Sequence, residues 1–132
     1  MRITVGSRTL TRDDVVAVAR HGAEVVIDAD ALDAMTATRA LIAGLAHDTV
    51  PHYGVSTGFG ALATTHIPLA KRAELQRSLV RSHAASSGAE VEREVVRATM
   101  LLRLATLATG RTGARPVVAE TYAAMLNAGL TP

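Results

Sequence analysis

The sequence predicts a mainly α-helical fold, in which a small N-terminal helical domain with short β-hairpin elements leads into the start of a long helical bundle. Three observations support this class. Although 48% of the 132 residues are hydrophobic, only three are aromatic, so the core must consist of Leu, Val, Ile, Met and Ala, a mixture that favours helices. Apolar residues recur at helical spacing along most of the chain. Glycine and proline residues separate these segments.

Two short extended runs begin the chain. Residues 2–5 and 8–10 lie on either side of Gly6, a pattern that predicts a small hairpin or an edge pairing. A third run, residues 24–27, is short and rich in β-branched side chains. These runs account for the minor β content of the predicted fold.

Local capping signals place the first two helices. Thr11 and Asp14 have the spacing of a capping box, so a helix is expected there, and Gly22 ends it. Asp28 can cap a second helix, whose apolar residues repeat at helical spacing to about His47.

Three further helices are expected in the second half of the chain. The first covers residues 69–85 and is broken by the segment 86–88. The strongest helical pattern covers residues 91–109. Pro116 begins a last helix, which ends near Asn127.

The helix expected at residues 91–109 is apolar on every face. One stripe consists of Val91, Val95, Ala98, Leu102 and Ala105. Three leucines lie on other faces, namely Leu101, Leu104 and Leu107. Because a domain of this size has a small core, we expect that the three leucines cannot all be buried in it. The chain is therefore expected to self-associate or to expose apolar surface.

Composition excludes several classes of protein. The chain has no cysteine, which rules out disulfides and thiolate metal sites. The net charge is only +2, and the basic excess in residues 71–115 is better interpreted as a solvated helix surface than as an anion-binding face. The uncharged residues 49–70 contain two prolines and are not a membrane helix. No signal peptide is recognised. We therefore expect a cytoplasmic protein with neither nucleic acid nor membrane as a partner.

The uncharged loop at residues 49–70 contains the stretch Tyr53-Gly-Val-Ser-Thr-Gly-Phe-Gly60. A glycine-rich loop with one phenol is suited to carry a reactive group. Gly54 to Gly58 match a nucleophile elbow, and Gly58 to Ala63 match a dinucleotide fingerprint, but neither match has the preceding strand that these motifs need. The five histidines show no metal-ligand spacing, so no metal site is expected.

Three blocks together resemble the aromatic amino acid ammonia-lyases. They are Tyr53 to Gly60, Leu75-Gln-Arg-Ser-Leu-Val-Arg-Ser-His83, and Gly110-Arg-Thr-Gly-Ala-Arg-Pro116. The resemblance covers nearly the whole chain, from the helix at Thr11 to Pro132. It is strongest to the actinobacterial members that act on histidine, because relatives specific for phenylalanine tend to place two apolar residues where this chain has Ser82-His83.

The resemblance implies a homotetrameric enzyme of histidine catabolism that eliminates ammonia from histidine to give urocanate. Its electrophile is a methylidene-imidazolone ring, formed from an internal Ala-Ser-Gly, with no metal. Tyr53 corresponds to the base that removes a β-proton. Ser82 and His83 correspond to substrate-binding residues, with His83 facing the substrate side chain, and Gly60 is also expected to bind substrate. The resemblance gives His52 no such role. As a base, the Tyr53 phenol is poor near pH 7 unless positive charge or hydrogen bonds favour the phenolate.

The sequence departs from the family in one respect. It contains no Ala-Ser-Gly, and the nearest candidate, Ala85-Ser-Ser-Gly88, is one residue too long. We therefore expect the N-terminal part of a much longer enzyme, inactive alone, with residues 1–110 as an N-terminal lyase domain and residues 111–132 as the start of the central helical region. The alternatives are a fragment of a tyrosine or phenylalanine ammonia-lyase or aminomutase, and a stand-alone helical interaction module.

Overall fold

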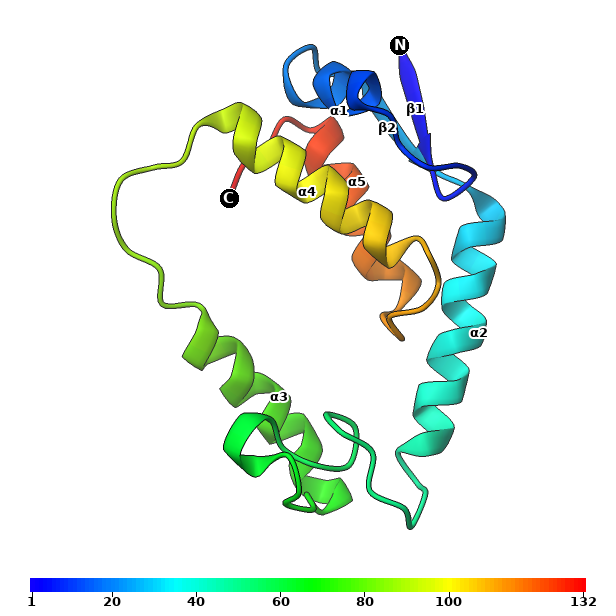
Figure 1. Ribbon diagram of the computed structural model, residues 1–132, viewed down its shortest axis with the longest axis vertical. Coiled ribbons are helices and arrows are strands. Elements are labelled where there is room, and N and C mark those ends of the chain that lie inside the picture. Colours follow the sequence, from blue (N-terminus) through cyan, green and yellow to red (C-terminus); the bar gives the residue numbers. More distant parts are fainter. The chain divides into compact units, whose positions relative to one another are not determined.

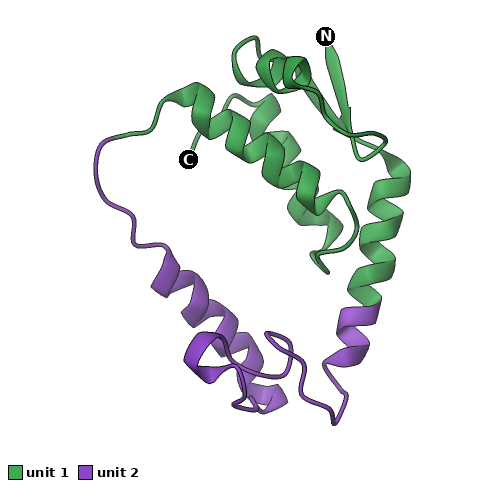
Figure 2. Ribbon diagram, viewed as in Figure 1, with its two compact units in different colours: residues 1–40, 90–132 green, residues 41–89 purple.

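A computed structural model describes all residues, 1–132, and contains five α-helices and two short strands (Figure 1). The predicted mainly helical class is therefore confirmed. The chain divides into two compact units (Figure 2): unit 1 consists of residues 1–40 and 90–132, and unit 2 consists of residues 41–89. The domain boundary expected near residue 110 stays a prediction.

The two strands belong to unit 1 and pair in parallel. β1 (Arg2–Val5) lies beside β2 (Glu24–Ile27), and residues 8–10 form no strand. The predicted hairpin is therefore wrong. A tight turn cannot join parallel strands, which need a longer crossover connection. Here α1 (Arg12–Ala19) lies between the two strands in the chain and provides that connection.

The predicted capping signals operate at the first two helices. The Thr11 hydroxyl accepts a hydrogen bond from the Asp14 N–H, and the Asp14 carboxylate accepts one from the Thr11 N–H at 2.8 Å. At the start of α2 (Ala29–Leu45), the Asp28 carboxylate accepts a hydrogen bond from the Asp30 N–H. Each bond satisfies a backbone donor that has no partner within the helix.

The core of unit 1 brings together the sheet, α1, α4 (Arg93–Leu107) and α5 (Pro116–Asn127). Its largest fully buried apolar side chains are Ile3, Val5, Val18, Val25, Met35, Leu101, Leu104 and Leu126. No aromatic residue is fully buried there. The core is therefore aliphatic, as the composition predicts.

The buried face of α4 differs from the expected one. Leu101, Leu104 and Leu107 all lie in the core, so the prediction that they cannot all be buried is wrong. The apolar stripe that includes Val95 and Leu102 is instead the exposed face. α4 carries apolar residues on more than one face, and its contacts with α1 and α5 bury the face of Leu101, Leu104 and Leu107.

A buried arginine connects three helices of unit 1. The Arg97 guanidinium, on α4, donates hydrogen bonds to the Val18 carbonyl at 3.0 and 3.1 Å and to the Leu126 carbonyl at 3.0 Å. Both carbonyls lie in the last turn of their helices, where the helix dipole is negative. Burial lowers the pKa of Arg97, and the neighbouring Arg93 adds to this effect. The carbonyls at the C-terminal ends of α1 and α5 therefore offset the cost of burying the Arg97 guanidinium.

Unit 2 contains the end of α2, the Tyr53 loop, the short 3₁₀ helix η1 (Gly60–Leu62) and α3 (Leu69–His83). The Arg72 guanidinium donates to the Ala46 carbonyl and, at 2.9 Å, to the Ile67 carbonyl. Both ends of the loop are thus bound to the first turn of α3. None of the residues of α3 is buried. In the whole chain, no helix combines the length and apolar character that crossing a membrane requires.

Candidate functional site

Two hydroxyl groups hold the Tyr53 loop in shape. Ser56 and Thr57 are buried. The Ser56 Oγ accepts a hydrogen bond from the His52 N–H at 2.8 Å, and the Thr57 Oγ1 accepts one from the Gly54 N–H at 3.2 Å. Both bonds end on residues adjacent to Tyr53. The loop therefore has a defined local conformation despite its glycine content.

Close packing requires two of the glycines in this loop. At Gly54, where φ is +70°, a Cβ would lie 2.9 Å from the Phe59 Cε1. At Gly58, a Cβ would lie 2.6 Å from the Leu62 Cβ. A side chain at either position would displace its neighbour. Because neither glycine has a side chain, the Phe59 and Tyr53 rings can meet edge to face, with centroids 5.9 Å apart and planes at 85°.

The Tyr53 side chain and the surface at Gly60 are both accessible. Tyr53 is 64% exposed. Gly60 has a φ of +55°, and no atom lies within 4 Å of the position that a Cβ would occupy. A phenol and an open backbone surface therefore occur within one short loop.

The second predicted pair, Ser82 and His83, lies at the end of α3. The Nδ1 of His83 is 2.9 Å from the Leu79 carbonyl oxygen and 3.0 Å from the Ser82 Oγ. Because a carbonyl oxygen can only accept, Nδ1 is the donor. In the neutral ring, Nε2 is then left as an acceptor. The Ser82 hydroxyl also donates to the Leu79 carbonyl, at 2.9 Å.

No contact in this chain joins Tyr53 to His83. The loop is bound to the first turn of α3 through Arg72, whereas His83 is the last residue of that helix. Fifteen residues of helix, at about 1.5 Å per residue, separate these ends by roughly 20 Å. The structure therefore orders two separate groups of the predicted site residues.

Sequence reasoning missed the pairing of His52 with Asp48. The His52 Nε2 is 2.9 Å from the Asp48 Oδ2. Donation from this ring, together with a hydrogen bond from the Val50 N–H, lowers the pKa of Asp48 below its ordinary value. The two residues have the four-residue spacing of a helical ion pair, but α2 ends at Leu45, so that spacing does not predict a contact here.

The residues of this chain do not fit a ring-forming or metal-binding site. The ring precursor is Ala-Ser-Gly, whereas Ala85 to Gly88 form an exposed, irregular segment that is one residue longer. No group of three or more His, Asp or Glu side chains is arranged to hold a metal ion.

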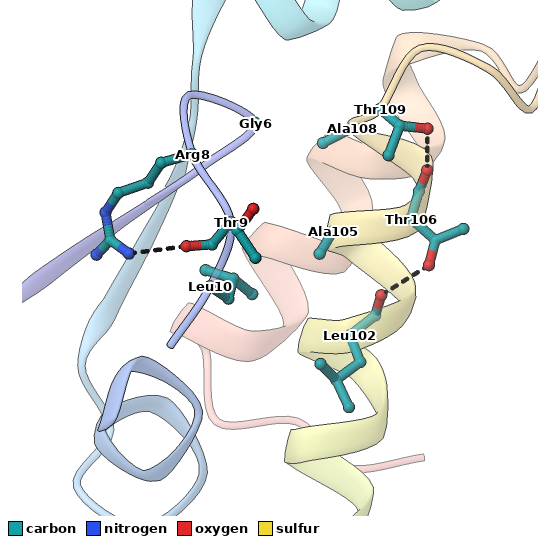
Figure 3. A pocket seen from close by; sticks show the side chains of 9 residues that line it. All are labelled: Gly6, Arg8, Thr9, Leu10, Leu102, Ala105, Thr106, Ala108 and Thr109. Atoms are coloured by element: carbon teal, nitrogen blue, oxygen red, sulfur yellow. Dashed lines mark hydrogen bonds between the residues drawn. The ribbon is translucent and has the colours of Figure 1, made fainter. Parts of the chain in front are cut away.

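A cavity of about 530 Å³ lies within unit 1, and no residue of the Tyr53 loop lines it (Figure 3). It is lined by Gly6, Arg8, Thr9, Leu10, Leu102, Ala105, Thr106, Ala108 and Thr109. The Arg8 guanidinium donates to the Thr9 carbonyl, and the Thr106 and Thr109 hydroxyls donate to carbonyls of α4. The guanidinium and these two hydroxyls are therefore engaged within the protein.

The chain thus presents a helical scaffold with an exposed phenol on a glycine-rich loop and, at the end of α3, a histidine whose Nδ1 bonds to a carbonyl. Residues 10–132 match the sequence model of the aromatic amino acid lyases. A histidine ammonia-lyase of Streptomyces griseus is 58% identical over 130 residues, which cover 98% of this chain and 25% of that protein. The chain therefore belongs to the aromatic amino acid lyase family.

Solved structures of this family share the fold. A tyrosine aminomutase from Streptomyces globisporus is 36% identical with a TM-score of 0.93, over 100% of this chain and 25% of that one. A histidine ammonia-lyase from Trypanosoma cruzi is 34% identical with a TM-score of 0.82, over 97% of this chain and 24% of that one. The chain thus spans about a quarter of the length of the relatives that it matches.

Proposed function

We propose that the chain is the N-terminal part of a histidine ammonia-lyase, which eliminates ammonia from L-histidine to give urocanate. The observation that carries this proposal is the orientation of His83. Its Nδ1 donates to the Leu79 carbonyl, which leaves Nε2 to accept a hydrogen bond from the N–H of a substrate imidazole. A phenyl ring has no such donor. The 58% identity to a histidine ammonia-lyase supports the same substrate.

Tyr53 is the proposed base. Its phenolate oxygen takes the β-proton, the Cα=Cβ double bond forms as the Cα–N bond breaks, and the protonated amine (–NH3+) leaves as ammonia. The exposed hydroxyl can reach a bound amino acid, while the edge contact with Phe59 restricts the ring. A positioned base of this kind typically contributes about 10² to 10⁴ in rate.

Ser82 and Gly60 complete the proposed recognition of the substrate. The Ser82 Oγ lies 3.0 Å from the His83 Nδ1 and helps to hold the imidazole in one orientation. The open surface at Gly60 leaves room for the substrate backbone beside the loop.

The electrophile is proposed to come from outside these residues. The family is known for a methylidene-imidazolone group that accepts electron density from the substrate, and this chain has no Ala-Ser-Gly to form it. The full-length polypeptide is proposed to supply the ring. The 132-residue chain alone should therefore form no urocanate, and urocanate above background in an absorbance assay of this chain would contradict the proposal.

A homotetramer in the cytoplasm is the proposed state of the full-length enzyme. An isolated helix of the length of α3 is marginal in water, yet none of its residues is buried. On α4, the exposed apolar residues Val95 and Leu102 form a second uncovered surface. Coverage by the remaining polypeptide and by further copies would bury both surfaces.

Two substitutions in the full-length polypeptide test the assigned roles. Tyr53→Phe removes one hydroxyl and keeps the ring, so kcat should fall by about 10² to 10⁴ with little change in KM. His83→Leu removes the contact to the imidazole, so KM should rise and discrimination against tyrosine and phenylalanine should relax. If Tyr53→Phe leaves kcat within a few fold while KM rises, Tyr53 only binds substrate, and His83 is the next candidate for the base.

A tyrosine or phenylalanine lyase or aminomutase is the second candidate. It is favoured by the likeness to a tyrosine aminomutase over the entire chain. Comparing kcat/KM for histidine, tyrosine and phenylalanine separates the two candidates. A stand-alone helical interaction module, the third alternative, would lack turnover with all three substrates even as the full-length polypeptide.

A further inference from the structure

His52 is the residue at which the turn carrying Tyr53 closes. Its N–H donates to the Ser56 Oγ at 2.8 Å. Its carbonyl accepts from the N–H groups of Val55, Ser56 and Thr57 at 3.1, 2.9 and 3.3 Å. The backbone bonds at both ends of the turn therefore converge on the residue that precedes Tyr53.

The side chain of His52 is held as well. Its Nε2 lies 2.9 Å from the Asp48 Oδ2, and because a carboxylate only accepts, Nε2 is the donor. The other carboxylate oxygen of Asp48 accepts from the Val50 N–H at 3.1 Å. Asp48 thus fixes the ring of His52 to the segment that follows α2, while the backbone of His52 fixes the turn.

We propose that His52, oriented by Asp48, is a positioning residue for Tyr53. The inference rests on the proposed role of Tyr53 as the base. Tyr53 is 64% exposed, and the aromatic ring that meets it, Phe59, belongs to the same loop, so the turn that closes on His52 helps to set the direction of the phenol. A change of about 1 Å in the position of a reacting group can cost on the order of 100-fold in rate.

The Asp48–His52 pair is suited to orient the turn that carries Tyr53 rather than to stabilise the fold. Its side chains are 38% and 28% exposed, and ion pairs at such positions contribute little to folding stability. Loss of the pair should therefore lower kcat while the melting temperature stays close to that of the wild type. A residue whose role is only structural would show the opposite pattern.

The kinetic test uses four variants of the full-length polypeptide. His52→Ala should lower kcat about ten-fold or more, with KM within about two-fold. His52→Gln keeps an N–H donor for Asp48 and should restore most of the loss. The double variant Asp48→Ala/His52→Ala should be no slower than His52→Ala, because the two residues act as one unit. His66→Ala, an exposed histidine of the same loop with no side-chain hydrogen bond, is the matched control and should match the wild type.

A second measurement does not depend on activity. With 3-fluorotyrosine incorporated, the ¹⁹F resonance lost in Tyr53→Phe identifies Tyr53. It should shift or broaden in His52→Ala and remain close to the wild-type position in His52→Gln and His66→Ala.

Three results would overturn the positioning role: wild-type kcat in His52→Ala, a His52→Gln variant as slow as His52→Ala, or an unchanged Tyr53 resonance in His52→Ala. If the wild-type polypeptide releases no ammonia from histidine, the proposed function fails instead, and the ¹⁹F comparison still decides whether His52 orients Tyr53.

Discussion

Unit 1 and unit 2 differ in the kind of side chain that they bury. Every fully buried apolar side chain of the protein belongs to unit 1. In unit 2, the buried residues are Ser56, Thr57 and Gly58, all within the loop that carries Tyr53. Unit 1 therefore derives its stability from aliphatic burial, whereas local hydrogen bonds give unit 2 its shape.

The difference separates a scaffold from the segment that carries the proposed base. Burial of apolar area is the dominant favourable contribution to folding, while a typical hydrogen bond contributes only about 0.5 to 1.5 kcal/mol net. The bonds around Ser56 and Thr57 thus specify a conformation without adding much stability. A loop held in this way can present Tyr53 at an exposed surface, where a compact apolar core would enclose it.

The largest expected effect comes from damage to the apolar core. Leu104→Ala creates a cavity at a fully buried position of α4 and should lower the free energy of unfolding of unit 1 by about 3 kcal/mol. Leu102→Ala changes the same residue type on the same helix at a 51% exposed position, and should cost much less. Chemical denaturation measures both, and equal losses would show that α4 does not bury the face described here.

Arg97 is the next most sensitive position of unit 1. Arg97→Lys loses the guanidinium that reaches the ends of both α1 and α5, and should cost about 2 kcal/mol. Arg103→Lys, at an exposed position of the same helix, is the control and should be nearly neutral. If the two lysine variants melt at the same temperature, the buried guanidinium does not stabilise the helix ends.

A smaller and local effect is expected in unit 2. Ser56→Ala removes the acceptor for the His52 N–H and should weaken the turn by about 1 kcal/mol. Amide hydrogen exchange should accelerate at residues 52–57 and stay unchanged in α4. Ser87→Ala, at an exposed position outside the loop, is the control. Faster exchange throughout the protein would mean that the turn and the core are not energetically separate.

The smallest effect concerns the pH dependence of stability that Asp14 causes. The free energy of unfolding should change little through Asp14 between pH 7 and pH 5, and should fall only in stronger acid. Hydrogen bonds from Arg8 and from Thr11 hold the pKa of Asp14 far below its ordinary value of 3.8. The stabilisation is therefore complete above the unfolded-state pKa and is lost as the pH falls toward the folded-state pKa. Asp14→Asn should flatten the loss of stability below pH 4, whereas Asp13→Asn, its exposed neighbour, should retain it. Identical acid profiles for the wild type and Asp14→Asn would contradict this assignment.

The sequence by itself determined the features that depend on neighbouring residues. The helix at α1 begins at the capping box of Thr11 and Asp14, and α5 begins at Pro116, because these signals act within a single turn of the chain. The blocks at Tyr53 and His83 likewise indicated the family, since they are contiguous patterns of residue types. Their catalytic roles remain predictions.

Only the tertiary structure decided the features that depend on residues distant in the chain. The partner of β1 is β2, across a helix, and a local turn signal at Gly6 could not reveal it. The sequence of α4 offers apolar residues on more than one face, and contacts with α1 and α5 decide that Leu101 and Leu104 are buried while Leu102 is exposed. The pairing of Asp48 with His52 depends on the path of the chain after a helix has ended, and helical spacing does not describe that path.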